Sequence, residues 1–74
     1  MKREPIDSSM ISSIGYESST KTLEIEFNSG AVWQYFDFPK NLWKDFKNSD
    51  SYGRYFRDCI QDMFEEARVA RKRY

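Results

Sequence analysis

The stretch Thr22-Leu-Glu-Ile-Glu-Phe-Asn-Ser-Gly-Ala-Val-Trp-Gln-Tyr-Phe36 decides how this chain folds. Apolar and acidic residues alternate from Thr22 to Phe27, which is the pattern of a β-strand with one buried face. Asn28-Ser29-Gly30 is typical of a three-residue hairpin loop, because the third loop residue adopts a left-handed conformation that glycine tolerates. Residues 31–36 then form the returning strand of a predicted β-hairpin.

The length of this loop determines which side chains of the hairpin face the core. A three-residue loop pairs Ile25 with Trp33, and the apolar residues of both strands then share one face. A two-residue loop would instead place Trp33 beside Glu26. We therefore expect the three-residue register, which also pairs Leu23 with Tyr35.

A strand over residues 10–16 is expected before the hairpin, with the polar turn Ser18–Lys21 between them. A loop with an even number of residues keeps the apolar side chains on one face, and four residues pair Tyr16 with Leu23. The same register places Ser12 beside Phe27. The buried face predicted for the three strands consists of Ile14, Tyr16, Leu23, Ile25, Phe27, Trp33 and Tyr35.

Two helices are expected after these strands. The first begins at Phe38-Pro39 and ends near Asn48, since proline suits the first position of a helix. In the second, side chains at the helical period of about 100° per residue form an apolar stripe, which extends the helix to about Val69–Lys72. The stripe consists of Tyr52, Phe56, Cys59, Ile60, Met63, Ala67 and Ala70.

The predicted fold class is therefore α+β. It is a three-stranded antiparallel β-meander followed by two helices (β-β-β-α-α), of which the second is long. Residues 1–7 are polar, contain Pro5 and are expected to form a flexible N-terminal arm. Residues 8–74 are expected to form a single domain with a basic C-terminal helix extension, since 74 residues are too few for a second domain.

The composition excludes several classes of function. Twelve Lys and Arg balance twelve Asp and Glu, so a nucleic-acid contact over the whole surface is not expected. One cysteine and no histidine exclude a Cys/His zinc site, and no metal or other cofactor is predicted. No apolar run approaches the roughly 20 residues of a membrane span, and no signal peptide is predicted. The expected location is the cytoplasm, without membrane contact.

Nothing in the sequence predicts an enzyme. Glu24 and Glu26 share one strand face, and paired carboxylates can act as acid and base in glycoside cleavage. They lie on the face opposite the core, however, where we expect them to be solvated. Cys59 falls within the apolar helical stripe, and the chain has no histidine to activate its thiol.

The last eight residues carry four cations and no acidic side chain. A cationic helix stripe with an interleaved aromatic can bind a phosphate backbone and stack a base. Alternatively, the cations are a solvated helix end in which positive charge complements the helix dipole. The candidate nucleic-acid-binding residues are Arg57, Phe64, Arg68, Arg71, Lys72 and Arg73.

The opposite face of the sheet offers a second candidate surface. Ile11, Val32 and Phe36 are its apolar residues, and they lie beside the exposed edge of a three-stranded sheet. A protein partner or a second copy of the chain could cover them. Alternatively, the long helix folds back over part of this face.

A series of short segments follows in order along the chain: Ser8-Ser9, Ile14-Gly15-Tyr16, Thr22–Phe27, Ser29-Gly30, Trp33-Gln34-Tyr35, Pro39 and Ser51-Tyr52-Gly53-Arg54-Tyr55-Phe56. Taken together, these segments resemble the KTSC domain family. The resemblance covers roughly residues 8–60. It implies a small domain that occurs at the C-terminus of some lysyl-tRNA synthetases and as a stand-alone bacterial or phage protein.

The family's Tyr-x-Tyr motif reads Trp33-Gln34-Tyr35 here, and the predicted register places Trp33 and Tyr35 on the core face. The synthetase connection of the family suggests RNA as a partner. We therefore predict a non-catalytic binding module for RNA or another nucleic acid, acting through the basic C-terminal helix. The alternative is a protein–protein interaction adaptor or homodimer that uses the outer sheet face or the long helix.

Overall fold

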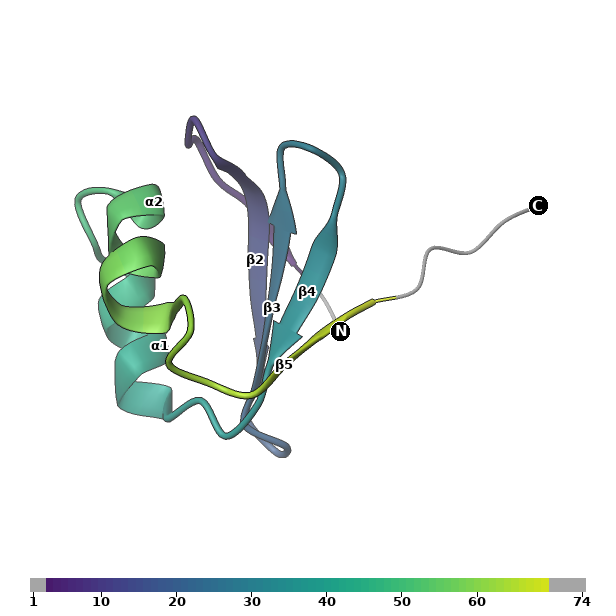
Figure 1. Ribbon diagram of the computed structural model, residues 1–74. Coiled ribbons are helices and arrows are strands. Elements are labelled where there is room, and N and C mark those ends of the chain that lie inside the picture. The colour runs from purple at the N-terminus through teal and green to yellow at the C-terminus, as the bar shows by residue number, and fades with distance from the viewer. Residues whose placement is uncertain (1–2, 70–74) are drawn as a thin grey trace.

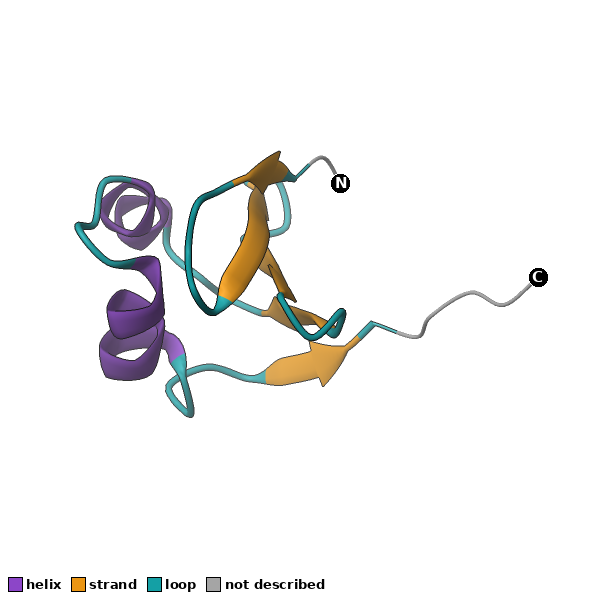
Figure 2. Ribbon diagram, turned by 90° about the horizontal axis from the view of Figure 1, so that it is seen from above, coloured by secondary structure: helices purple, strands orange, loops and turns teal. Residues whose placement is uncertain are grey.

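An antiparallel sheet with helices against one of its faces makes up the computed structural model, which describes residues 3–69 (Figures 1 and 2). The strands lie in the sheet in their order along the chain. They are β1 (Glu4–Pro5), β2 (Ile11–Glu17), β3 (Thr22–Phe27), β4 (Val32–Tyr35) and β5 (Glu66–Arg68). The helical layer consists of α1 (Lys40–Lys47), α2 (Tyr52–Tyr55) and the π-helical turn η1 (Phe56–Ile60), which continues α2.

The predicted register of β3 with β4 is confirmed, and so is that of β2 with β3 from Ile14 onward, but the predicted pairing of Ser12 with Phe27 is wrong. Ile25 of β3 pairs with Trp33 of β4, and Tyr16 of β2 pairs with Leu23. Gly30 has a φ of 96°, the left-handed conformation expected at the third position of the hairpin loop. The loop lengths therefore determine which side chains face the helices.

The core lies between the sheet and the helical layer. Every side chain of the predicted buried face belongs to the core cluster or packs against it. Phe38 and Phe46 contribute fully buried rings from the α1 region. Tyr16 stacks on Trp43 with ring centroids 5.4 Å apart, and its hydroxyl donates to the Phe38 carbonyl oxygen. Aromatic contacts thus join β2 to α1.

A β-bulge in β2 changes the orientation of Ile11. Ser13 pairs with Glu26, but Ile11 rather than Ser12 pairs with Phe27, so the register shifts by one residue between them. The extra residue reverses the side-chain alternation of the strand end. Ile11 is therefore 0% exposed and part of the core, and its predicted place on the outer face is wrong.

The predicted three-stranded sheet with a long second helix is wrong. The helical segment ends at Ile60, Asp62 adopts a left-handed φ of 62°, and the chain then extends into β5. Pairing with β4 satisfies backbone groups that would otherwise form an open edge. Within the described residues, only Phe56 and Ile60 of the predicted apolar stripe are buried, whereas Met63 is 66% exposed.

The opposite edge of the sheet is formed by the N-terminal segment. Residues 1–7 were expected to form a flexible arm, but Glu4–Pro5 form β1, and Glu4 pairs with Ile14 of β2. The Ile6 N–H also donates to the Ser12 carbonyl oxygen at 3.0 Å. The N-terminal segment is thus tied to the sheet from Glu4 to Ile6.

Candidate functional site

Among residues 3–69, the residues predicted to bind nucleic acid do not share one helix face, because the helical segment ends at Ile60. Arg57 is exposed in η1. Phe64 lies in the turn after η1 and packs its ring against Phe38, with centroids 4.9 Å apart. Arg68 lies in β5. Arg71, Lys72 and Arg73 lie outside the described residues.

The apolar partner face predicted for the outer side of the sheet is also divided. Ile11 belongs to the core. Val32 and Phe36 are partly buried and lie beside β5, where the Phe36 N–H donates to the Glu65 carbonyl oxygen at 2.9 Å. These three residues therefore do not form one exposed apolar surface.

Glu24 differs from the solvated residue expected from the sequence, because it is only 7% exposed. One of its carboxylate oxygens is paired with Arg3, and the other accepts a hydrogen bond from Gln34 Nε2 at 2.9 Å. The Ser13 hydroxyl donates to Glu26 Oε1 at 3.0 Å in the same group. Since both oxygens of Glu24 are bonded, this polar group holds the outer face of the sheet together.

The Trp33-Gln34-Tyr35 motif lies in β4, and the packing of Trp33 and Tyr35 in the core accounts for it without a ligand. Tyr35 is 2% exposed, and Trp33 is partly buried against the core. Burial raises the pKa of Tyr35, and the nearby Glu66 and Asp62 carboxylates raise it further. The phenol is therefore held in its neutral form.

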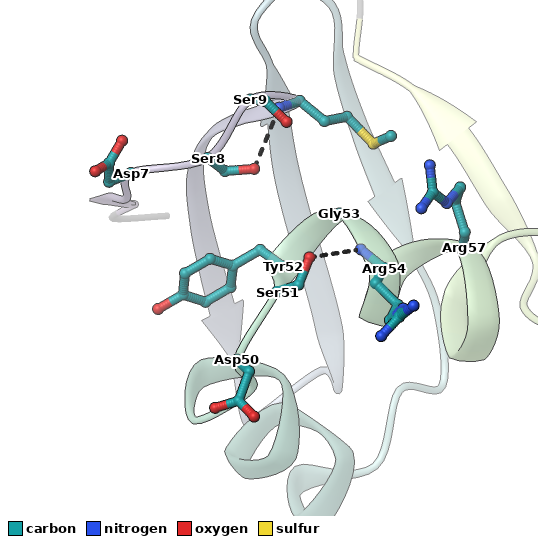
Figure 3. Close-up of a pocket in the computed structure, with 10 residues that line it drawn as sticks. Asp7, Ser8, Ser9, Asp50, Ser51, Tyr52, Gly53, Arg54 and Arg57 are labelled. Carbon is teal, nitrogen blue, oxygen red and sulfur yellow. Dashed lines mark hydrogen bonds between the residues drawn. The ribbon is translucent and has the colours of Figure 1, made fainter.

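A polar pocket of about 300 Å³ opens where the loop between β1 and β2 meets the start of α2 (Figure 3). The loop contributes Asp7–Met10, and the helical segment contributes Asp50–Arg54 and Arg57. Three serine hydroxyls, two carboxylates and two guanidinium groups line it. Its volume is at the lower end of the range of small-molecule sites, about 300–1,000 Å³.

Two serine hydroxyls of this pocket are fixed by the backbone. Ser8 Oγ accepts hydrogen bonds from the N–H groups of Met10 at 3.2 Å and Ile11 at 3.3 Å. Ser51 Oγ accepts from the Arg54 N–H at 3.3 Å, as the N-cap of α2. Because each oxygen acts as an acceptor, each hydroxyl proton remains available to donate to a ligand.

Arg54 and Arg57 supply the positive charge of the pocket. They are three residues apart on the continuous helical segment, and in Figure 3 the Arg57 side chain points upward, toward the side where the Ser8–Ser9 loop lies, whereas the Arg54 side chain points downward. Among residues 3–69, neither guanidinium lies within ion-pair distance of a carboxylate. Guanidinium groups bind phosphate with several charge-assisted hydrogen bonds, so both remain free to bind an anion.

A second hollow of about 260 Å³ adjoins this pocket and shares Asp50, Ser51 and Arg54 with it. It continues past Tyr55 to Cys59. We call the pocket and this hollow together the groove. Arg54 lies between its two parts, which suits an extended, chain-like ligand better than a compact one.

Other kinds of site are not found in the part of the chain that the structure describes. Within residues 3–69, no group of three or more His, Cys, Asp or Glu side chains could hold a metal ion. Over the same residues, no helix has the length and apolar character needed to cross a membrane.

Comparison with known proteins assigns the chain to a family. The model of the KTSC domain matches residues 7–64. The chain belongs to the KTSC domain family. The crystal structure of a KTSC domain protein from Yersinia pestis is 33% identical in sequence, with a TM-score of 0.91 over 93% of this chain and 97% of that one. The KTSC domain is a small module of unknown function.

Relatives of this KTSC domain occur alone and within larger proteins. A lysine–tRNA ligase of Nostoc punctiforme is 39% identical over 59 residues, which is 80% of this chain but only 10% of the ligase. The chain thus spans about a tenth of the length of the ligases it matches. An uncharacterized protein of Stutzerimonas stutzeri is 39% identical over 61 residues, 82% of this chain and 86% of that protein.

The whole lining of the pocket, from Asp7 to Arg57, lies within the part of the chain that matches the KTSC domain. Sequence reasoning identified only Arg57 among these residues. A signal for six of the others was present in two segments that resemble the family, Ser8-Ser9 and Ser51–Phe56, which the core pattern explains only in part. Arg68 and the cations after it lie beyond residue 64.

Proposed function

We propose that this KTSC domain is a non-catalytic module that binds single-stranded RNA, with the groove at the start of α2 as its contact surface. In this proposal, Arg54 and Arg57 bind phosphate groups, and the Ser51 hydroxyl donates to a phosphate oxygen. The observation that carries it is the pair of neighbouring arginines, without ion-pair partners among the described residues, that line one polar pocket.

The mixed charge of the groove favours RNA over a simple anion. Asp7 and Asp50 lie in the same pocket as the arginines, and a carboxylate can only accept hydrogen bonds. A ligand that fits both groups must offer donors as well as phosphate. RNA has such donors in its 2′-hydroxyl groups and in its base amino groups.

The net charge and the relatives also agree with a small RNA contact. A chain with a net charge of zero suits contact with a few phosphates rather than with a long stretch of backbone. Lysine–tRNA ligases, whose name gives tRNA as a substrate, contain a segment similar to this chain. This similarity supports RNA over other phosphate-bearing polymers.

The salt dependence of binding distinguishes the groove from the cationic tail. With two phosphate contacts, log K is expected to fall with log salt at a slope of about −1.4, which is about a sevenfold loss between 50 and 200 mM. If Arg68, Arg71, Lys72 and Arg73 also bind phosphates, the slope is about −4.2 and the loss is over about 300-fold. Fluorescence anisotropy of a labelled single-stranded RNA measures this slope with the full chain.

Charge variants test the residues themselves. The double variant R54Q/R57Q is expected to weaken RNA binding by about tenfold or more. The matched control K40Q/K44Q removes two exposed charges from α1 and is expected to leave binding unchanged. Gly53→Leu places a larger side chain against Met10 in the lining of the pocket without a change of charge and should also weaken binding.

Two results would overturn the proposal. One is the absence of RNA binding at 50 mM salt, where phosphate contacts are strong. The other is normal binding by R54Q/R57Q together with a loss of binding in R68E/R71E/R73E, which would assign any affinity to the tail.

A further inference from the structure

The strand β5 forms one edge of the sheet. It pairs only with β4, and it lies at the rim of the sheet in Figure 2. Glu66, Ala67 and Arg68 are all exposed. An edge of this kind presents backbone hydrogen-bonding groups that another strand can pair with.

The hydrogen bonds to β4 show which residues of β5 face the open side. The Phe36 N–H donates to the Glu65 carbonyl oxygen at 2.9 Å, and the Val69 N–H donates to the Val32 carbonyl oxygen at 2.8 Å. Residues 65, 67 and 69 therefore direct their backbone groups toward β4. Because this direction alternates along a strand, Glu66 and Arg68 direct their N–H and C=O groups outward.

We propose that two copies of this chain associate by antiparallel pairing of their β5 strands about a twofold axis at Ala67. In this register, Glu66 of each copy lies opposite Arg68 of the other, so the interface contains two equivalent Glu66–Arg68 pairs. These are the residues whose backbone groups point outward, so each Glu66–Arg68 pair exchanges two hydrogen bonds. The sheets of the two copies then join into one continuous sheet.

The side chains agree with this register. Paired residues lie on the same face of a sheet, so the Glu66 carboxylate meets the Arg68 guanidinium of the second copy, a favourable cross-strand pair. Ala67 lies opposite itself at the axis, where Cα atoms approach to about 4.5 Å and a small side chain fits. A parallel arrangement would place like charges beside each other. The charge pattern thus favours a second copy in antiparallel orientation.

This interface differs from the dimer surfaces expected from the sequence. Ile11 of the expected outer face is buried, and the long helix does not form. Because β5 has only three residues, the interface belongs to the small, weak class below about 1,200 Å². We expect a dissociation constant between about 10 μM and 1 mM.

Sedimentation equilibrium of the full chain over this concentration range tests the proposal. The weight-average mass of the wild type should rise toward that of a dimer. Glu66→Arg or Arg68→Glu alone places like charges opposite each other twice, and each should weaken association by about tenfold or more. The controls Asp45→Arg and Lys44→Glu make the same charge changes on α1 and should not alter association.

The two single variants provide the sharper experiment when mixed. In a pair formed by one E66R copy and one R68E copy, unlike charges face each other at both positions, so an equimolar mixture should associate at least as well as the wild type. The double variant E66R/R68E restores unlike charges between identical copies and should associate with itself. Circular dichroism confirms that each variant is folded. A wild type that stays monomeric at about 1 mM, or a folded mixture that does not associate, would overturn the proposal.

Discussion

Removal of the Arg3 side chain is expected to destabilise the domain, although Arg3 lies almost at the N-terminus. Its guanidinium pairs with the Glu24 carboxylate, and Glu24 is 7% exposed. Arg3→Ala leaves this carboxylate without its cation on the outer face of the sheet. Gln34 Nε2 remains as a hydrogen-bond donor at 2.9 Å.

The size of the effect follows from the exposure of the pair. Removing one partner of a fully buried ion pair costs about 3–5 kcal/mol, whereas an exposed pair contributes about 0–1 kcal/mol. The Arg3 side chain is 30% exposed, so water can replace part of the lost interaction. We expect Arg3→Ala to cost about 1–2 kcal/mol, out of the roughly 4–11 kcal/mol typical of a domain of this size. The melting temperature should fall by about 4–16 °C.

Urea denaturation followed by tryptophan fluorescence measures this cost. In the background of Glu24→Gln, Arg3→Ala should cost about 1 kcal/mol less, because the buried charge is already absent. Arg57→Ala is the control, since it removes an exposed arginine without an ion-pair partner in the described residues and should change stability by less than about 0.5 kcal/mol. An equal cost of Arg3→Ala in both backgrounds would refute the reasoning.

Two further predictions concern the backbone and the core. Gly30→Ala should lower the free energy of unfolding in urea by about 1–2 kcal/mol, because Gly30 has a φ of 96°. Gly53→Ala in α2 should be neutral or stabilising, because there is space for a methyl group at that position. Equal costs at both positions would contradict this reasoning. Burial raises the pKa of Tyr35 in the folded state, so folding favours the neutral phenol. The stability that the neutral phenol contributes is complete below about pH 10, the pKa of an unfolded tyrosine, and is lost as the pH rises above that value. Denaturation between pH 8 and 11 should show a decline that Tyr35→Phe makes shallower, and an unchanged decline would count against the assignment.

The hairpin could be predicted from the sequence because its information is local. The loop Asn28-Ser29-Gly30 fixes the register between neighbouring strands, and the alternation of side chains then gives the buried face. The bulge in β2 could not be predicted in this way. It inserts one residue without a distinctive sequence signal, and Ile11 turns into the core only because of it.

The long helix was predicted wrongly because the strand that residues 66–68 pair with instead, β4, is distant in sequence. The helical period continues beyond Ile60 through Met63 and two alanines, so local pattern alone favours a helix. The edge of β4 provides an alternative set of backbone hydrogen bonds, which β5 takes up. Residues 66–68 have no large apolar side chain whose burial would stabilise a helix, so pairing with the edge of the sheet is favoured over a helix.

The candidate site was predictable only in part for the same reason. Arg57 stood out as a cation on a helix, but its partners in the pocket come from the loop at Asp7–Met10. Only the fold brings these two segments together. The cations of the tail, Arg71-Lys72-Arg73, are consecutive and form a clear sequence pattern, whereas the charges of the groove are dispersed along the chain.

The groove and the β5 edge can be tested separately because they lie at different places in the molecule. The loop that forms one wall of the pocket follows β1, which is the edge of the sheet opposite β5. Pairing through β5 therefore leaves this wall uncovered, and a dimer would present two grooves. An RNA long enough to reach both would gain affinity through effective concentration rather than through new contacts. RNA affinity measured with a short strand, below the concentration at which the chain associates, consequently reports on a single groove, and R68E should alter only the additional affinity of a longer strand.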